Sequence, residues 1–243
     1  MGKSLEWLKS KVDDVTCDKK LFKTILEDEA YVIGVVGGQT QKPDYYSISF
    51  LYDSIIDIFE KIKYSFFKVV DCNPSESLNE YNAYGELPTN ENNALYYIEN
   101  MVFRSIILWN LLAQLCNQFW KVNEPIRSVK TEKYFREQRS KHELADQIVT
   151  YFNEKDRVLG ETEFWGGNHR FVRNYRNKMA HWYSPNISGF SSIAVEQRPP
   201  AMFVLKRVTE DFIEAWHFIT MILKDITASF SNFDPIDYIL DLV

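Results

Sequence analysis

Apolar residues recur three and four positions apart along most of this chain, which is the period of amphipathic helices. The pattern predicts helices over residues 18–32, 45–70, 94–122, 130–157, 168–183 and 206–230, and a short terminal helix after Asp234 and Pro235. Only 9 glycines and 8 prolines are present, which is too few for a turn-rich all-β protein. We therefore expect an all-α fold, a bundle of about seven to eight helices.

A long segment rich in Asn, Ser, Gly and Pro interrupts this pattern at residues 72–93 and predicts a loop. The loop separates an N-terminal helical region, 1–92, from a helical region over 93–243. A loop of this length either carries function or joins two parts of the chain. The two regions can therefore form separate parts or pack as one continuous domain.

Turn-forming residues also bracket the predicted helix over 168–183. Two consecutive glycines precede it, and Asn168 is the predicted N-cap. Residues 184–201 contain Pro and Gly and predict a second loop. Near 192–205 we expect a short β-hairpin with strands at 192–195 and 202–205.

Charge and composition narrow the function classes. The chain has 28 Lys and Arg against 34 Asp and Glu, a net charge of −6, which excludes binding of nucleic acid through bulk positive charge. Because 45% of the residues are hydrophobic, the chain can bury a core, and intrinsic disorder is excluded. The three cysteines match no zinc or disulfide spacing, which indicates free thiols in a reducing compartment.

Targeting and cofactor signals are missing from the sequence. The N-terminal residues carry charges too early for a signal peptide, and the least charged stretch, 105–120, is too short to cross a bilayer. We therefore expect a cytoplasmic protein with no membrane partner. No phosphate loop, G-x-S-x-G or H-E-x-x-H motif occurs, and the carboxylates lack the paired spacing of a metal cage. Consequently the sequence predicts neither a metal nor another cofactor.

One segment departs from the acidic composition. No Asp or Glu occurs between Glu163 and Glu196. The basic side chains of this window are Arg170, Arg173, Arg176 and Lys178, with His169 and His181. The window contributes +4 to the net charge and the rest of the chain −10. A basic site confined to one helix can attract an anion locally although the chain as a whole is acidic.

A helical wheel at about 100° per residue divides the helix over 168–183 into two faces. The apolar face, which we expect to contact the core, contains Phe171, Val172, Tyr175, Met179, Trp182 and Tyr183. Arg173, Asn177 and His181 form a stripe at i, i+4 and i+8 on the opposite face. Arg176 lies at the edge between the faces, about 140° from His181. The Arg176 guanidinium can therefore approach His181 only through its long stem, or a second chain must complete the pair.

The run from Arg176 to His181 resembles the R-N-x-x-x-H motif of the HEPN superfamily (higher eukaryotes and prokaryotes nucleotide-binding), and the resemblance covers about residues 93–243. It implies a metal-independent RNA endonuclease of the toxin, phage-defence or RNA-processing type that leaves a 2′,3′-cyclic phosphate. It also implies a homodimer, with RNA or a nucleotide as ligand and a cognate antitoxin as a further partner. The resemblance marks Arg176 and His181 as catalytic and Asn177 as supporting. The nearby Arg173, Lys178 and Arg170 would contact RNA phosphates.

The implied chemistry agrees with these residue types. RNA cleavage without a metal requires deprotonation of the 2′-hydroxyl, protonation of the leaving 5′-oxygen and stabilisation of the phosphorane charge. Histidine suits the proton transfers because its pKa lies near neutrality. Arginine suits the charge because its planar fork donates two parallel hydrogen bonds.

Other polar features have a plain structural interpretation. Acidic residues are interspersed among the basic residues of the segment 130–141, so we expect a solvated face. The alternative is that this segment contacts the RNA backbone. Arg136 and His142 match a looser form of the motif, with four to six residues between Arg and His. His169 is expected on the surface, and His217 in the core or in an interface.

Asn110, Gln114 and Asn117 or Gln118 form a polar stripe on an otherwise apolar predicted helix. Because buried polar groups must be paired, this stripe either lines a cleft or meets its copy across a dimer. The alternative to a ribonuclease is a non-catalytic all-helical module that binds a nucleotide or a protein partner, with the motif serving the structure.

Overall fold

The computed structural model describes residues 4–19, 21–22, 45–75, 82, 84–157, 164–190 and 195–230. Most of the helix predicted over 18–32 and the short helix predicted after residue 234 lie outside these ranges. The described elements are α1 (Leu5–Asp14), α2 (Tyr45–Cys72), α3 (Thr89–Phe119), the 3₁₀ turn η2 (Ile126–Ser128), α4 (Thr131–Gln138), α5 (Glu143–Phe152), β1 (Lys155–Arg157), β2 (Phe164–Gly166), α6 (Asn168–His181), β3 (Gly189–Phe190), β4 (Val195–Glu196) and α7 (Ala201–Phe230). The all-α prediction is confirmed.

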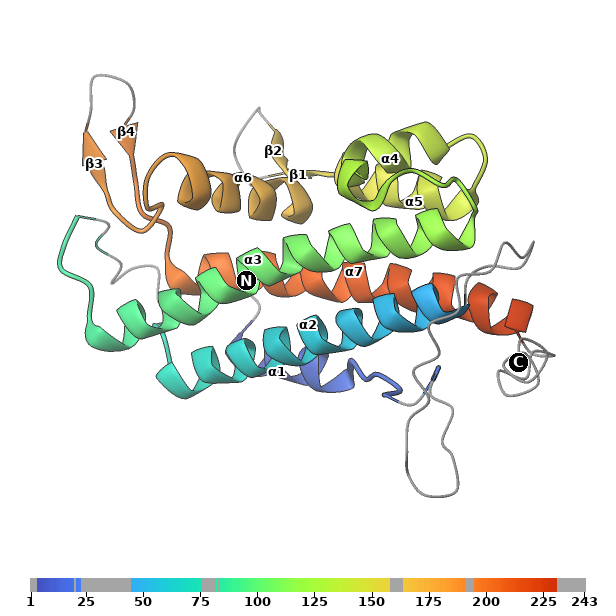
Figure 1. The fold of residues 1–243 in the computed structure, drawn as a ribbon. Helices are drawn as coiled ribbons and strands as arrows, with labels where there is room; N and C mark the ends of the chain where they lie inside the picture. The colour runs from blue at the N-terminus through green and yellow to red at the C-terminus, as the bar shows by residue number, and fades with distance from the viewer. Residues whose placement is uncertain are drawn as a thin grey trace.

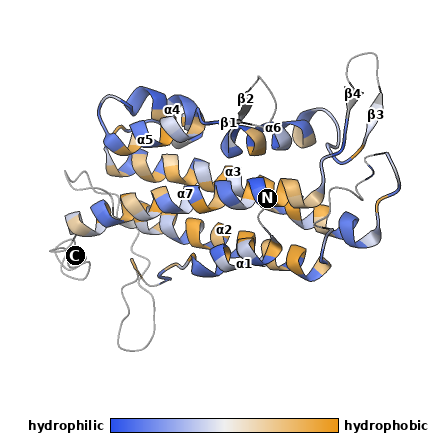
Figure 2. Ribbon diagram, turned by 180° about the vertical axis from the view of Figure 1, so that it is seen from behind, coloured by the Kyte–Doolittle hydropathy of each residue, from blue (hydrophilic) through white to orange (hydrophobic). Residues whose placement is uncertain are grey.

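The helices lie in three layers (Figure 1). Helices α1 and α2 form one outer layer, α3 and α7 the middle layer, and α4, α5 and α6 the other outer layer. Hydrophobic residues cover much of α3 and α7, whereas α4 and α6 are more hydrophilic (Figure 2). Within the described ranges no helix has the length and apolarity needed to cross a bilayer. Helix α6 therefore rests on the apolar middle layer and keeps its other side for solvent.

Helices α2 and α3 are antiparallel neighbours along their length (Figure 1). Buried α2 residues recur at alternating steps of four and three: Ile48, Tyr52, Ile55, Phe59, Ile62, Phe66 and Val69. Buried α3 residues do the same: Ala94, Ile98, Met101, Ser105, Leu108, Leu112 and Leu115. This spacing is the heptad pattern of coiled-coil packing. The pairing with α2 therefore leaves other faces of α3 available for α7 and α6.

Helix α1 was not predicted, because the first helix expected from the sequence begins at residue 18. Its signals are nevertheless local. The Ser4 hydroxyl caps the helix by accepting a hydrogen bond from the Trp7 N–H at 3.2 Å. Leu5, Leu8 and Val12 then recur at helical spacing and are buried.

The single helix predicted over 130–157 is wrong. After α4 the chain turns, with the N–H groups of Lys141 and His142 donating to the Gln138 carbonyl, and α5 starts a new direction. The turn lets the His142 ring stack on Trp120, with ring centroids 3.9 Å apart. Aromatic packing therefore overrides the helical propensity of this stretch.

The loop before α7 contains a hairpin, but not between the predicted strands. β3 pairs with β4 through Gly189–Glu196 and Phe190–Val195, whereas residues 202–205 belong to α7. The physical reason is Pro200, whose carbonyl accepts hydrogen bonds from the N–H groups of Phe203 and Val204. Proline is well tolerated at a helix start, because its missing N–H would be unpaired there anyway.

Asp211 of α7 joins four helices through its buried carboxylate. Trp109 Nε1 of α3 donates to Oδ2 and the Tyr151 hydroxyl of α5 donates to Oδ1, each at 3.0 Å. His169 Nδ1 of α6 lies 3.3 Å from Oδ1, and the His169 ring stacks on Phe152. Burial and the Asp211 carboxylate raise the pKa of Tyr151, so its hydroxyl keeps its proton and donates. The prediction of His169 as a surface residue is therefore wrong, since its side chain is only 4% exposed.

Replacement of Asp211 by Ala should destabilise the fold by about 3–5 kcal/mol, the range for removal of one partner from a buried polar pair. The substitution leaves three buried donors without their acceptor. Urea denaturation followed by far-UV circular dichroism measures the change. Asp225, exposed on the same helix, is the matched control, and Asp225→Ala should change the free energy of unfolding by less than about 0.5 kcal/mol. Equal effects of the two substitutions would contradict the role of Asp211.

Candidate functional site

Helix α6 begins with a close backbone approach. Gly167 N donates to the Glu154 carbonyl at 2.8 Å, and a Cβ at Gly167 would lie 3.0 Å from that oxygen. Gly167 is the N-cap, so the prediction of Asn168 in that role is wrong by one residue. The Asn168 side chain instead binds α7, accepting from Arg207 Nη1 at 2.9 Å and donating to Glu210 Oε2 at 3.0 Å.

The apolar face of α6 contacts the core as far as Met179, which is partly buried against it. Val172 and Tyr175 are buried, and Phe171 packs edge-on against Phe203 of α7. Trp182 and Tyr183, predicted on the same face, are 73% and 38% exposed, so their assignment to the core is wrong. The helix ends at His181 and the backbone leaves the helical path at Trp182, with φ −125° and ψ −76°. A helical wheel no longer applies beyond that point.

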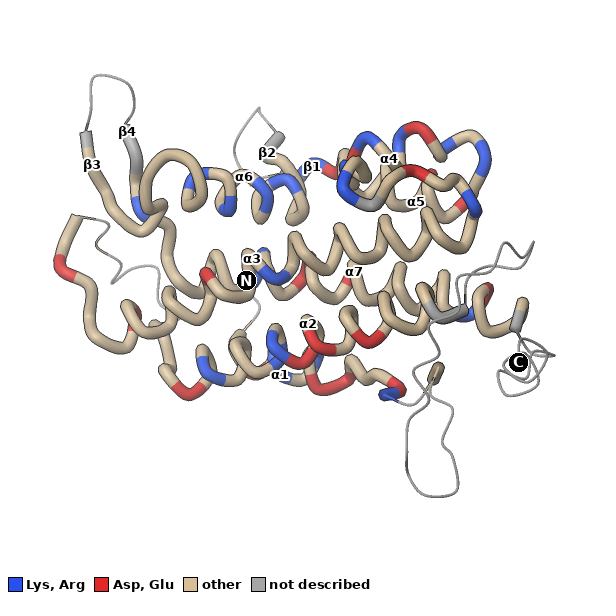
Figure 3. The backbone as a smooth tube through the Cα atoms, viewed as in Figure 1, with Lys and Arg blue, Asp and Glu red and all other residues tan. Residues whose placement is uncertain are grey.

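The basic residues of α6 differ in their surroundings. Figure 3 shows Lys and Arg without Asp or Glu on α6, whereas α4 carries both signs. Arg173 Nη1 pairs with Glu132 Oε1 of α4, and the other Glu132 oxygen lies 3.6 Å from Arg136 Nη2. Arg170 is exposed, and Lys178 Nζ lies 5.8 Å from the centre of the Tyr183 ring. Part of the positive charge expected for phosphate binding, that of Arg173, is therefore already matched by an acid.

The side chains of the motif residues Arg176, Asn177 and His181 form no such ion pair with the described residues. Arg176 is partly buried, and its Nε has neither solvent-accessible surface nor a hydrogen-bond partner. His181 is exposed as the last residue of α6, and Asn177 is partly buried. Within the described ranges no hydrogen bond or ion pair involves the side chains of Arg176, Asn177 or His181. One protomer therefore does not join Arg176 to His181 by a hydrogen bond.

In the looser motif match, His142 has a structural role. The His142 ring stacks on Trp120 at an interplanar angle of 4°, and burial lowers the pKa of His142. Arg136 faces solvent near Glu132. The segment 130–141 is a solvated face with mixed ion pairs, as predicted.

Two further predictions concern His217 and the polar stripe of α3. His217 is exposed, so its assignment to the core is wrong, and its place in an interface stays a prediction. Asn117 is buried, and its amide both accepts from Glu124 N and donates to Glu124 O, at 3.1 and 2.9 Å. Asn110 Oδ1 accepts from the Thr131 hydroxyl at 2.5 Å. These two residues of the polar stripe thus hold the connection between α3 and α4 within one chain.

A series of side-chain hydrogen bonds, not predicted from the sequence, links α6 to α3. The Tyr175 hydroxyl donates to Asn186 Oδ1, and Asn186 Nδ2 donates to Glu99 Oε1 at 2.5 Å. Burial raises the pKa of Glu99, and the hydrogen bond from Asn186 offsets part of that rise. The partners are far apart in sequence, so no local pattern could have paired them.

The described part of the chain contains no group of three His, Cys, Asp or Glu residues that could hold a metal ion. Cys17, Cys72 and Cys116 are free thiols. Comparison of the chain with protein-family models, curated proteins and solved structures found no match.

Glu99→Gln tests the cost of this buried acid. The raised pKa means that the folded state binds a proton more readily than the unfolded state, so the wild type loses stability as pH rises from about 4.3 through the folded-state pKa. Glutamine keeps an acceptor for Asn186 and carries no charge. We expect the variant to gain stability relative to wild type between pH 4 and pH 8, measured by urea denaturation. A difference that does not change with pH would contradict the assignment.

Proposed function

We propose that the chain is a HEPN-like, metal-independent RNA endonuclease that uses Arg176 and His181 as catalytic residues and Asn177 in support. The observation that carries the proposal is the contrast along α6. Arg173 is paired with an acid and His169 is buried in the core, whereas Arg176 and His181 lack partners among the described residues. An arginine fork and an accessible imidazole are the groups that phosphodiester cleavage without a metal requires.

The place of His181 suits proton transfer. It is exposed as the last residue of α6, so its imidazole is accessible to an RNA strand. The neutral imidazole would accept the 2′-hydroxyl proton, and the imidazolium would return a proton to the leaving 5′-oxygen. Asn177, one turn before His181, would orient the ring or bind a phosphate oxygen.

Arg176 would stabilise the charge that develops on the phosphorane. Its partial burial lowers the local dielectric constant, which strengthens its attraction for an anion. Arg170 and Lys178 would contact neighbouring phosphates of the RNA, and Arg173 could do so only after release from Glu132.

The active site is proposed to be shared between two protomers. Arg176 and His181 lie about 140° apart on one helix, so one protomer would supply the arginine and its partner the histidine. Trp182, which follows His181, is 73% exposed, and tryptophan is enriched in protein–protein interfaces. We further propose a cytoplasmic role of the toxin, phage-defence or RNA-processing type, with a cognate antitoxin as a partner.

Purified protein should cleave single-stranded RNA in EDTA and leave 2′,3′-cyclic phosphate ends. His181→Ala should lower the rate by about 10²- to 10⁴-fold, the usual contribution of general acid–base catalysis. Arg176→Ala should lower it by roughly 10²- to 10³-fold through loss of charge stabilisation.

The matched controls are His217→Ala and Arg136→Ala. Both side chains are exposed and lie on other helices, so both variants should keep the wild-type rate. If the wild type cleaves no better than His181→Ala, the catalytic proposal fails and the non-catalytic helical module remains.

A mixture of the two inactive variants tests the shared site. In a heterodimer of Arg176→Ala and His181→Ala protomers, one of two composite sites keeps both side chains. After mixing and reassembly, activity should return to about a quarter of the wild-type value, since half of the dimers are heterodimers with one intact site. No recovery in a mixture shown by mass spectrometry to contain heterodimers would contradict a site shared in this way.

A further inference from the structure

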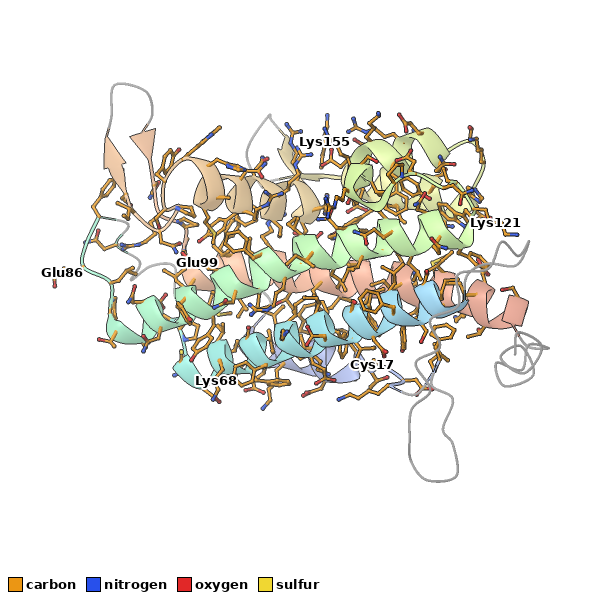
Figure 4. The ribbon with its side chains drawn as sticks, viewed as in Figure 1. Cys17, Lys68, Glu86, Glu99, Lys121 and Lys155 are labelled. Carbon is orange, nitrogen blue, oxygen red and sulfur yellow. The ribbon has the colours of Figure 1, made fainter. Side chains whose placement is uncertain are left out.

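A cavity of about 600 Å³ lies beyond the C-terminus of α6. Its wall comes from three separate stretches of the chain: residues 84–87, the first turns of α3 and residues 184–188, with Arg198 beside them. Figure 4 labels Glu86 and Glu99, which line the cavity from the first two of these stretches. The volume is in the range of sites for small molecules and admits a single nucleoside rather than a duplex.

Hydrogen bonds within the chain hold the wall of this cavity in place. Arg198 is 7% exposed, and its Nη2 donates to the carbonyls of Asn82 and Gly85 at 2.9 and 3.2 Å. Its backbone N donates to the Ser188 hydroxyl at 2.9 Å. A Cβ at Gly85 would lie 2.8 Å from the Asn82 side chain, so a larger residue would disturb this turn. These contacts fix the 82–85 turn against the segment after α6.

Aromatic rings and apolar side chains form much of the wall. Tyr84 and Tyr96 line the cavity and are 58% and 62% exposed, although tyrosine rings usually bury most of their area. Leu87, Leu95 and Ile187 add apolar surface. Exposed aromatic rings at the mouth of a cavity suit stacking of an unpaired base.

The charges of the wall favour a base over a phosphate. Glu86 and Glu99 bring two carboxylates, whereas the Arg198 guanidinium is already bound to backbone carbonyls. Glu99 Oε1 accepts from Asn186, and its Oε2 accepts no hydrogen bond from the described residues. A carboxylate oxygen of this kind accepts a hydrogen bond from an exocyclic amino group, as Glu does from cytosine.

We propose that this cavity binds one unpaired base of single-stranded RNA, with preference for bases that carry an exocyclic amino group over uracil. The inference deepens the proposed ribonuclease function and rests on it for the identity of the ligand. Asn186 lines the cavity and is bonded to Tyr175, the residue before Arg176. A base held there lies against the segment that continues directly from His181. The cavity thereby selects which phosphodiester reaches the motif.

The probe is a fluorescent six-nucleotide oligoadenylate with 2′-O-methyl groups, which cannot be cleaved because the 2′-hydroxyl is blocked. Its Kd is measured by fluorescence anisotropy at one fixed salt concentration. Tyr84→Ala and Tyr96→Ala should each raise the Kd by roughly 5- to 100-fold, the effect of losing one base–aromatic stack. Tyr64→Ala is the matched control, because Tyr64 is 61% exposed on α2 and outside the cavity.

Base preference is read from the ratio of the Kd values for oligouridylate and oligoadenylate. Wild type should favour oligoadenylate, and Glu99→Gln should bring the ratio toward one, because the glutamine amide can also donate to uracil O4. Failure of wild type to bind either probe, equal binding of duplex RNA, or tyrosine variants that bind as wild type would each overturn the inference.

These outcomes are separable from the fate of the proposed function. If RNA is cleaved in a His181-dependent manner while the tyrosine variants bind normally, the ribonuclease stands and the base site is lost. If the probe binds in a Tyr84- and Tyr96-dependent manner while RNA is never cleaved, the base site stands and the ribonuclease is lost.

Discussion

The buried Asp211 carboxylate constrains four helices: α7, which carries it, and α3, α5 and α6, which supply its partners. A carboxylate in the core is tolerated only when donors surround it, because water cannot reach it. Trp109, Tyr151 and His169 meet that requirement from three different helices, so none of these helices can shift without leaving a buried polar group unpaired. The position of α6 over the core follows from this constraint.

Helix α6 is held firmly at one end and open at the other. Its first turn is bound through Asn168 to α7 and through His169 to Asp211, and its middle through Tyr175 to Asn186. Beyond these ties the helix ends at His181, with Trp182 exposed to solvent. A rigid base with an exposed last turn is the arrangement that a site completed by a ligand or a second chain requires.

Electrostatics restrict the basic surface more than the charge of the 164–195 window suggests. Glu132 neutralises Arg173, so the charge available to an anion comes mainly from Arg170, Arg176 and Lys178. The wall of the neighbouring cavity holds two carboxylates, Glu86 and Glu99, and its Arg198 guanidinium is bound to backbone carbonyls, so it suits an uncharged group better than a phosphate. In the proposed complex, the RNA backbone would therefore lie along α6 while one base turns into the cavity.

Local periodicity in the sequence was enough to predict the helical class, the long helices over 45–70 and 94–122, and the presence of Arg176, Asn177 and His181 on one helix. The burial of His169, the ion pair of Arg173 and the exposure of Trp182 became evident only from the folded chain. Glu132 and Asp211 lie 41 and 42 residues from Arg173 and His169, and Trp109 lies 102 residues from Asp211. The burial of a polar side chain depends on such distant partners, which no local pattern encodes.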